Sequence, residues 1–146
     1  FDEYFKLPEK TASSFSNGWF SAGDMAVMDE EGYFKIVDRK DNMIITGGEN
    51  VYPSEVEEAV ADHEAVFDCA CIGVPDEKWG EKVVAVVTLK PDFTPDSVSG
   101  DEIRDACRRK IAGYKVPKEV FIIKEADMPR TPTGKILHRK LREKFT

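Results

Sequence analysis

The sequence has 146 residues, enough for one compact domain or for one domain and a short piece of another. Hydrophobic residues make up 41% of it and aromatic residues 10%, which excludes general disorder because this proportion suffices for a buried core. The formal net charge of -7 argues against a general nucleic-acid-binding protein, which would normally be basic.

The charge is unevenly distributed along the chain. From Asp127 to the end there are six lysines and arginines against two acidic residues, whereas the rest of the chain is acidic. A basic tail on an acidic body indicates either a binding site for an anionic ligand or a solvated basic helix, and the charge alone does not distinguish the two. The longest apolar run, residues 83–87, is too short to cross a bilayer, and no signal peptide is visible. Because the first residue is Phe1 and not Met, we expect the sequence to be part of a longer protein.

The first predicted element is a β-hairpin over residues 25–37. Short β-prone runs at 25–28 and 33–37 flank an Asp-Glu-Glu-Gly turn signal, and a further short strand is predicted at 43–46. Residues 1–40 otherwise contain only a loop, with no helix of their own, and look like the edge of another domain.

A helix is predicted at about 53–62, where Pro53 suits the first turn. Two β-branched, apolar runs at 69–74 and 82–90 predict buried strands, and a third strand is predicted at 119–124.

The last third of the chain adds two helices. Ser99 and Glu102 form a capping box that opens a helix to about Lys110. The proline-rich run 128–134 favours neither helix nor sheet, and a last basic helix is predicted at about 137–144. Strands that alternate with helices predict a small α+β domain with a roughly three-stranded sheet and packed helices.

The cysteines and histidines show no metal-binding pattern. Cys69, Cys71 and Cys107 form no CxxC pair, and we expect them to be buried free thiols in a reducing compartment, which predicts a cytoplasmic protein. The two histidines, His63 and His138, do not stand at a metal-ligand spacing, and we predict no metal site in this chain.

Three short motifs carry candidate chemistry, and each also has an ordinary structural interpretation. Pro-Thr-Gly-Lys at 132–135 lacks the first glycine and the Ser/Thr of a Walker loop, so that motif is rejected. Its lysine is either a functional cation held by a stiff, proline-flanked loop before a helix or an ordinary exposed lysine. Gly47 and Gly48 form either a strand-ending turn or a place where backbone passes close to a threaded ligand. Asp24 is either a turn aspartate or a carboxylate that accepts two hydrogen bonds from a ribose diol.

Taken in chain order, four segments closely resemble the successive late motifs of adenylate-forming enzymes. They are Gly-Trp-Phe-Ser-Ala-Gly-Asp at 18–24, Gly-Tyr-Phe-Lys-Ile-Val-Asp-Arg-Lys-Asp at 32–41, Gly-Gly-Glu-Asn-Val-Tyr-Pro-Ser-Glu at 47–55 and Pro-Arg-Thr-Pro-Thr-Gly-Lys at 129–135. That superfamily includes acyl- and aryl-CoA synthetases, peptide-synthetase adenylation domains and beetle luciferases. The resemblance covers essentially the whole chain.

The resemblance implies a division of the chain and a set of roles. Residues 1–40 would end a large N-terminal adenylation domain, whose loop and β-hairpin they form, and residues 41–146 would be a small C-terminal lid domain. Asp41 would be the hinge between the two domains. Asp24 and Arg39 would bind the ribose of ATP or AMP, although this chain has Ala-Gly-Asp where family members usually have Thr-Gly-Asp.

The resemblance also implies a catalytic lysine and a passage for CoA. Lys135 would bridge the substrate carboxylate and the α-phosphate during adenylation. Gly47 and Gly48 would let the pantetheine arm of CoA pass. Trp79 and Tyr114 occupy positions where some CoA ligases place aromatic side chains under the CoA adenine, and ordinary packing is the alternative for both.

The implied enzyme is an AMP-forming acid–thiol ligase, most like an acyl-CoA synthetase for fatty or aromatic acids. It would convert a carboxylic acid to acyl-AMP and then to acyl-CoA, using ATP, CoA and Mg²⁺, with the Mg²⁺ held in the large N-terminal domain. The segment alone is expected to be inactive. The alternatives are an adenylating enzyme of the peptide-synthetase or acyl-AMP ligase type, or a non-catalytic binding or regulatory module. The presence of Asp24, Asp41 and Lys135 favours an enzyme.

Overall fold

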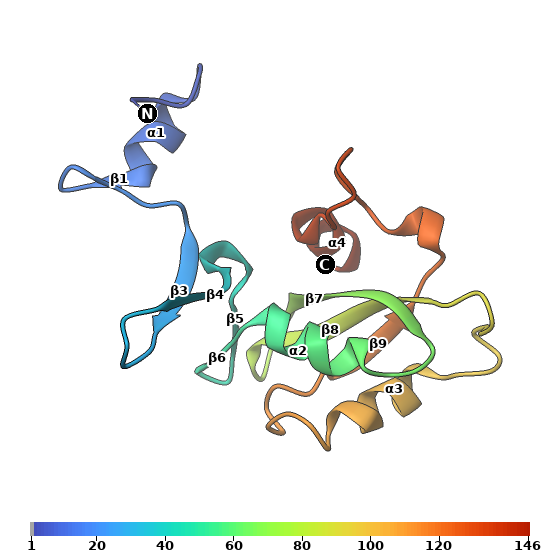
Figure 1. The fold of residues 1–146 in the computed structure, drawn as a ribbon. Helices are drawn as coiled ribbons and strands as arrows, with labels where there is room; N and C mark the ends of the chain where they lie inside the picture. Colours follow the sequence, from blue (N-terminus) through green and yellow to red (C-terminus); the bar gives the residue numbers. More distant parts are fainter. Residues whose placement is uncertain (1) are drawn as a thin grey trace. The chain divides into compact units, whose positions relative to one another are not determined.

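The computed structural model describes residues 2–146, and these divide into two compact units (Figure 1). The first unit ends at Asp41 and the second runs from Asn42 to Thr146. No helix among residues 2–146 has both the length and the apolar character needed to span a membrane.

The first unit contains one helix and two small antiparallel sheets. Its elements are α1 (Pro8–Ser14), β1 (Phe15–Ser16), β2 (Trp19–Phe20), β3 (Asp24–Met28) and β4 (Phe34–Arg39). β3 and β4 form the predicted hairpin. Asp29 closes its turn, because Asp29 Oδ1 accepts hydrogen bonds from the backbone N–H groups of Glu31 and Tyr33 at 3.0 and 2.8 Å.

The helix α1 corrects the expectation that residues 1–40 contain only a loop and a hairpin. None of its residues is buried, so the sequence has no apolar stripe at helical spacing from which the helix could be predicted. Local features stabilise it instead. Pro8 stands in the first turn, and Thr11 Oγ1 accepts a hydrogen bond from the Tyr4 N–H at 2.9 Å, which ties the preceding chain to the helix.

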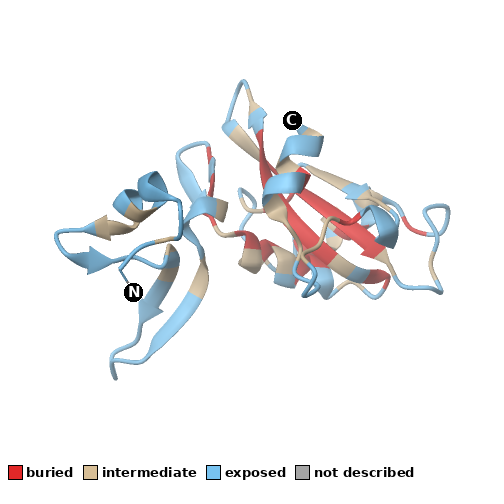
Figure 2. Cartoon of the chain, turned by 90° about the horizontal axis from the view of Figure 1, so that it is seen from above, coloured by how far each residue is buried: buried red, intermediate tan, exposed pale blue. Residues whose placement is uncertain are grey.

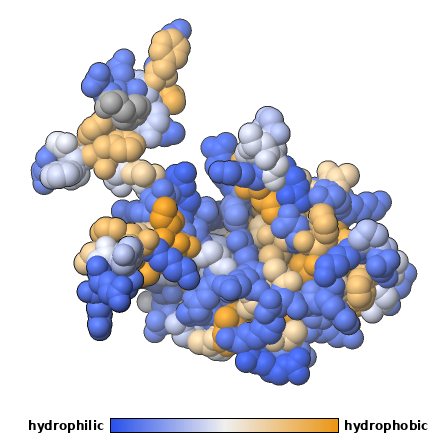
Figure 3. All heavy atoms as spheres, in the orientation of Figure 1, coloured by the Kyte–Doolittle hydropathy of each residue, from blue (hydrophilic) through white to orange (hydrophobic). Residues whose placement is uncertain are grey.

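The first unit has no buried residue between positions 2 and 41 (Figure 2). Large apolar side chains remain at its surface, and Figure 3 shows orange, hydrophobic atoms over the β3–β4 hairpin. Trp19 is 81% exposed, Tyr33 70% and Phe34 73%. Because burial of apolar surface is the dominant favourable contribution to folding, this unit lacks the means to be stable by itself.

The second unit is built on a five-stranded sheet with the order β6-β5-β8-β7, in which β9 pairs in parallel with β8. The strands are β5 (Ile44–Thr46), β6 (Glu49–Val51), β7 (Val66–Asp76), β8 (Gly80–Leu89) and β9 (Glu119–Ile122). The predicted α+β class is confirmed, and the three longest predicted strands correspond to β7, β8 and β9. The structure adds β6, a short strand that pairs with the predicted strand β5.

Helices cover both faces of this sheet (Figure 1). They are α2 (Pro53–Ala61), α3 (Gly100–Cys107) and α4 (His138–Phe145). Residues 2–146 also contain two short 3₁₀ turns, η1 (Lys40–Asn42) and η2 (Glu125–Asp127). Cys71 and Ala85 join a core with α2 and α3, whereas Ile72 and Val86 join a second core with Leu141 of α4. Burial on both faces explains why β7 and β8 are continuous apolar runs in the sequence.

The helix α3 begins at the predicted capping box and ends earlier than predicted. The Ser99 side chain accepts a hydrogen bond from the Glu102 N–H, and the Glu102 side chain accepts one from the Ser99 N–H. The helix ends at Cys107 instead of Lys110, because the next residues continue as a single turn. In that turn the Lys110 and Ile111 N–H groups both donate to the Cys107 carbonyl, at 2.9 and 3.2 Å.

All three cysteines are buried thiols outside any disulfide, as predicted. Burial raises the pKa of the Cys69 thiol to about 12, and the nearby carboxylates of Glu57 and Asp68 add to the increase. The Cys69 thiol therefore stays protonated at neutral pH, which protects it from modification.

The unequal burial of the two units predicts that they differ in stability when separated. A segment of residues 42–146 should unfold in one cooperative thermal transition, whereas residues 1–41 alone should show no transition. Removal of residues 1–41 should shift the unfolding midpoint by less than about 4 °C, because the hydrophobic core of the second unit consists of its own residues. Circular dichroism measures both midpoints. A segment 42–146 that does not fold would contradict this prediction.

Candidate functional site

Asp24 and Arg39, the two predicted nucleotide-binding residues, form an ion pair. They stand directly opposite each other at the open end of the β3–β4 hairpin, and Arg39 Nε lies 2.8 Å from Asp24 Oδ1. The Arg39 guanidinium also donates to the Ala22 carbonyl at 3.2 Å. Two thirds of the Arg39 side chain and one third of the Asp24 side chain are exposed. A ligand with vicinal hydroxyl groups can therefore reach this carboxylate and this cation together.

Asp41, the predicted hinge residue, is exposed and lies in the 3₁₀ turn η1. The boundary between the two compact units falls directly after it. A short exposed turn can absorb a change in backbone angles more easily than a packed helix. The hinge role of Asp41 stays a prediction.

Lys135 is the last residue of a tight loop that we call the lysine loop, Thr131 to Lys135. The Thr131 N–H donates to the Lys135 carbonyl at 2.8 Å, and the Lys135 N–H donates to Thr131 Oγ1 at 3.1 Å. The residues flanking the loop, Arg130 and Ile136, form an isolated antiparallel bridge. Gly134 has a φ of +87°, a backbone conformation that glycine adopts without strain. The loop is thus held by its own backbone, and Lys135 is exposed.

A pocket of about 310 Å³ brings together three of the four predicted CoA-binding residues. It is lined by Thr46, Gly47, Glu49, Trp79, Gly113, Tyr114 and Lys118. The Lys118 ammonium lies 5.5 Å from the centre of the Trp79 ring, which places a cation over an aromatic face. Gly48, the fourth predicted residue, does not line this pocket, and a Cβ added to it would meet no atom within 4 Å. We name the cavity the aromatic pocket.

Gly47 is required by the geometry of the aromatic pocket. Its N–H donates to the Trp79 carbonyl at 2.8 Å, and its φ is +59°. A Cβ added at this position would lie 2.9 Å from Trp79 Cε3, closer than side chains approach one another. The absent side chain of Gly47 therefore makes room for the Trp79 ring.

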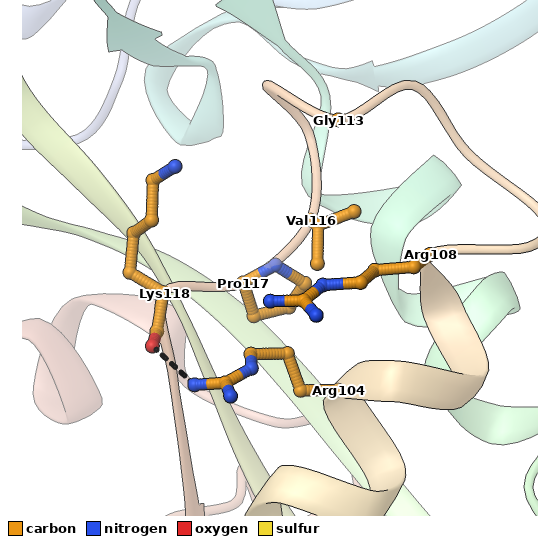
Figure 4. A pocket seen from close by; sticks show the side chains of 6 residues that line it. All are labelled: Arg104, Arg108, Gly113, Val116, Pro117 and Lys118. Carbon is orange, nitrogen blue, oxygen red and sulfur yellow. Dashed lines mark hydrogen bonds between the residues drawn. The ribbon is translucent and has the colours of Figure 1, made fainter.

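A second pocket, of about 350 Å³, adjoins the aromatic pocket and is basic (Figure 4). It is lined by Arg104, Arg108, Gly113, Val116, Pro117 and Lys118, so Gly113 and Lys118 belong to both pockets. Arg104 donates to the Lys118 carbonyl at 3.4 Å and pairs with Asp101 at 3.0 Å. Arg108 pairs with Asp105 at 3.1 Å and is mostly exposed. These cations suit an anionic group. We name this cavity the basic pocket.

Sequence reasoning missed the basic pocket and the surroundings of the lysine loop. Arg104 and Arg108 alternate with acids at helical spacing, which is typical of an ordinary solvated helix face and gives no functional signal. Arg130 stands inside the motif that contains Lys135, but its partners lie elsewhere in the chain. The predicted site residues also fall in different places, since Asp24 and Arg39 belong to the first unit and Lys135 lines neither pocket.

Comparison with known proteins gives a consistent result. Residues 55–135 match the family described as AMP-binding enzyme C-terminal domain. The chain is 47% identical over 144 residues to the long-chain-fatty-acid–CoA ligase FadD13 of Mycobacterium tuberculosis, a match that covers 99% of this chain and 27% of that protein. It is 39% identical over 143 residues to a 2-succinylbenzoate–CoA ligase of Listeria monocytogenes, covering 98% of this chain and 29% of the relative. The chain thus spans about a quarter of the length of these relatives.

Among solved structures, the chain is similar to MatB from Rhodopseudomonas palustris in two states. The ATP-bound structure matches with a TM-score of 0.87 at 36% identity and covers 99% of this chain and 28% of MatB. The apo structure matches with a TM-score of 0.70 at 37% identity and covers 98% of this chain and 28% of MatB. The two structures of MatB thus match this chain over nearly the same share of its length with different TM-scores.

The contact between Gly47 and Trp79 predicts that two adjacent glycines differ in their tolerance of a methyl group. Gly47→Ala should destabilise the second unit by about 1–2 kcal/mol more than Gly48→Ala, because both residues have positive φ but only Gly47 faces a ring. Denaturant unfolding measures the stability. In a Trp19→Phe background, the emission maximum of Trp79 should shift in Gly47→Ala and stay unchanged in Gly48→Ala. Identical spectra in the two variants would contradict the prediction.

Proposed function

The chain belongs to the AMP-binding enzyme C-terminal domain family, and from this we propose that it is the mobile C-terminal part of an ATP-dependent acyl-CoA synthetase. The proposed enzyme converts a carboxylic acid to an acyl-adenylate with release of pyrophosphate, and then to acyl-CoA with release of AMP. The observation that carries the proposal is Lys135, an exposed ammonium on a loop whose backbone is closed by its own hydrogen bonds. The acyl-CoA ligases among the relatives support the same reaction class.

Lys135 would serve the first half-reaction. Attack of a carboxylate on the α-phosphate of ATP brings two anions together and then increases the charge on the phosphoryl oxygens. A positioned ammonium offsets both the repulsion and the developing charge. A lysine places one compact charge between the carboxylate and the phosphate, whereas an arginine would pair its planar fork with two oxygens of only one of these groups.

Asp24 and Arg39 would hold the ribose of the nucleotide. Their ion pair presents a carboxylate that accepts hydrogen bonds next to a cation that donates them. Two vicinal hydroxyl groups of a ribose can bond to such a carboxylate together. The pair therefore orients the nucleotide without contacting the phosphate that reacts.

The second half-reaction would need the second unit to move. Lys135 serves the adenylation step, whereas CoA must approach the same acyl-adenylate, so we propose that rotation about Asp41 exchanges the lysine loop for the segment around Gly47. The position of the unit boundary supports this, because it falls directly after Asp41 in an exposed turn.

The two adjoining pockets would bind the nucleotide end of CoA. The rings of Trp79 and Tyr114 offer faces on which an adenine can stack, and Lys118 lies at the junction of the two pockets. Arg104 and Arg108 in the basic pocket suit the phosphate groups of CoA. Gly48 borders open space, because a Cβ added there would meet no atom within 4 Å, and this space is free for the pantetheine arm.

Mg²⁺ is a further expected component of the reaction. No group of three or more histidine, cysteine or acidic side chains within residues 2–146 is arranged to hold a metal ion, and we assign no step to it here. We propose that its ligands and the acid-binding pocket belong to the rest of a longer enzyme, since this chain spans 27% and 29% of the length of the two relatives.

The proposed role of Lys135 predicts a split between the half-reactions. In the full-length enzyme, Lys135→Ala should lower the rate of acyl-adenylate formation at least about 100-fold, because the transition-state charge loses its cation. Thioester formation from supplied acyl-adenylate should stay within about twofold of the wild type, since the lysine is withdrawn in that step. Lys140→Ala, which removes an exposed cation of α4, is the control. Equal loss of both steps would refute the assigned role.

The proposed hinge predicts the opposite split. Asp41→Pro fixes one backbone angle and restricts the residue before it, so it should slow thioester formation at least about tenfold and leave adenylation within about threefold. Asp41→Ala removes the carboxylate and keeps the backbone free, and it should retain both steps. Single-turnover measurements of each half-reaction test this. An unimpaired overall rate in Asp41→Pro would contradict the hinge.

A further inference from the structure

We propose that Arg130 is a positioning residue for Lys135, because its guanidinium ties the peptide directly before the lysine to carboxylates of the domain body. The inference rests on the proposed role of Lys135 in adenylation. Arg130 lines neither the aromatic pocket nor the basic pocket, so its role is to orient another residue.

Arg130 bridges three parts of the second unit. Its Nη2 lies 2.8 Å from Asp68 Oδ2 in β7 and 2.9 Å from Glu125 Oε1 in η2. Its Nη1 donates to the Gly134 carbonyl at 3.2 Å. Three quarters of the Arg130 side chain is shielded from solvent, so the guanidinium is held against the domain. One rigid, planar group thus connects the lysine loop to the sheet.

The contact with Gly134 fixes one peptide plane. The carbonyl of Gly134 and the N–H of Lys135 belong to the same peptide unit. Arg130 holds its carbonyl oxygen, and Thr131 Oγ1 accepts a hydrogen bond from its N–H at 3.1 Å. The direction of the Lys135 side chain follows from the orientation of this plane. Gly134 is the residue of the loop with the greatest conformational freedom, and it is the residue whose carbonyl Arg130 holds.

The base of the loop is anchored independently of Arg130. Before the loop, Met128 is buried in the second core with Leu141, and Ile136 packs against the same core after it. Farther along, His138 Nε2 lies 2.7 Å from Glu57 Oε1, and the same Glu57 oxygen accepts a hydrogen bond from the Cys71 N–H at 2.8 Å. Loss of Arg130 should therefore loosen the tip of the loop and leave the fold in place.

A lysine at position 130 could not replace this function. An ammonium is a single point of charge, whereas the guanidinium fork uses one nitrogen for the two carboxylates and another for the Gly134 carbonyl. Arg130→Lys keeps the charge next to Asp68 and loses the bridge. This variant therefore separates positioning from simple charge pairing.

The experiment measures both half-reactions of the full-length enzyme by single turnover in Arg130→Ala and Arg130→Lys. Both variants should lower acyl-adenylate formation about 10- to 100-fold, because a misplaced cation stabilises the transition state poorly, and leave thioester formation from supplied acyl-adenylate within about twofold. Arg139→Ala, which removes an exposed, ion-paired arginine of α4, should leave both rates unchanged. Wild-type adenylation in Arg130→Lys, or equal loss of both steps, would overturn the proposal.

A double substitution tests whether Arg130 acts through Lys135. In a Lys135→Ala background, Arg130→Ala should cause no further loss of adenylation, whereas a purely structural role predicts that the two losses multiply. If Arg130→Ala does not fold, Asp68→Asn weakens the same anchor at nearly constant shape, and it should show the same split between the steps. If Lys135→Ala alone leaves adenylation intact, the proposed function itself fails. If Lys135 is required and the Arg130 and Asp68 variants are unaffected, only the positioning role fails.

Discussion

The pairing of β7 with β8 is the constraint on which the second unit depends. Both strands are apolar on both faces, so the pair must be covered on each side to remain out of water. The helices α2 and α3 cover one face, and α4 with the residues before it covers the other. The two candidate functional regions follow from this arrangement. The aromatic pocket lies where the turn between β7 and β8 meets Gly47, and the lysine loop belongs to the segment that closes the opposite face.

The elements predicted well from sequence are those that depend on local chemistry or on strong burial. β7 and β8 were found from their β-branched runs, and the start of α3 from the reciprocal bonds of Ser99 and Glu102. The motifs single out Asp24 and Arg39 as candidate ribose-binding residues, and the register of the hairpin places the two residues opposite each other. In these cases neighbouring residues carry the information.

The features that could not be predicted from sequence are of two kinds. Some depend on partners far away in the chain, and others have no apolar periodicity that would indicate them. α1 has no buried face, so its residues show no periodicity. Arg130 appears in the sequence as one base in a basic tail, and only the fold shows that its partner Asp68 comes from β7. The basic pocket is similar, because Lys118, the residue before β9, is brought to Arg104 of α3 only by the fold. No spacing rule indicates such contacts.

The tie between His138 and Glu57 has a consequence for biosynthesis. The segment that carries Lys135 follows its partners in the chain, because Glu57 and Asp68 lie in elements that are made earlier. Contacts of such large sequence separation form late in folding, since the chain between them must first be closed into a loop. A partly folded chain therefore lacks the contacts that hold the lysine loop against the sheet, and the loop docks on the domain only when the rest of the second unit has folded.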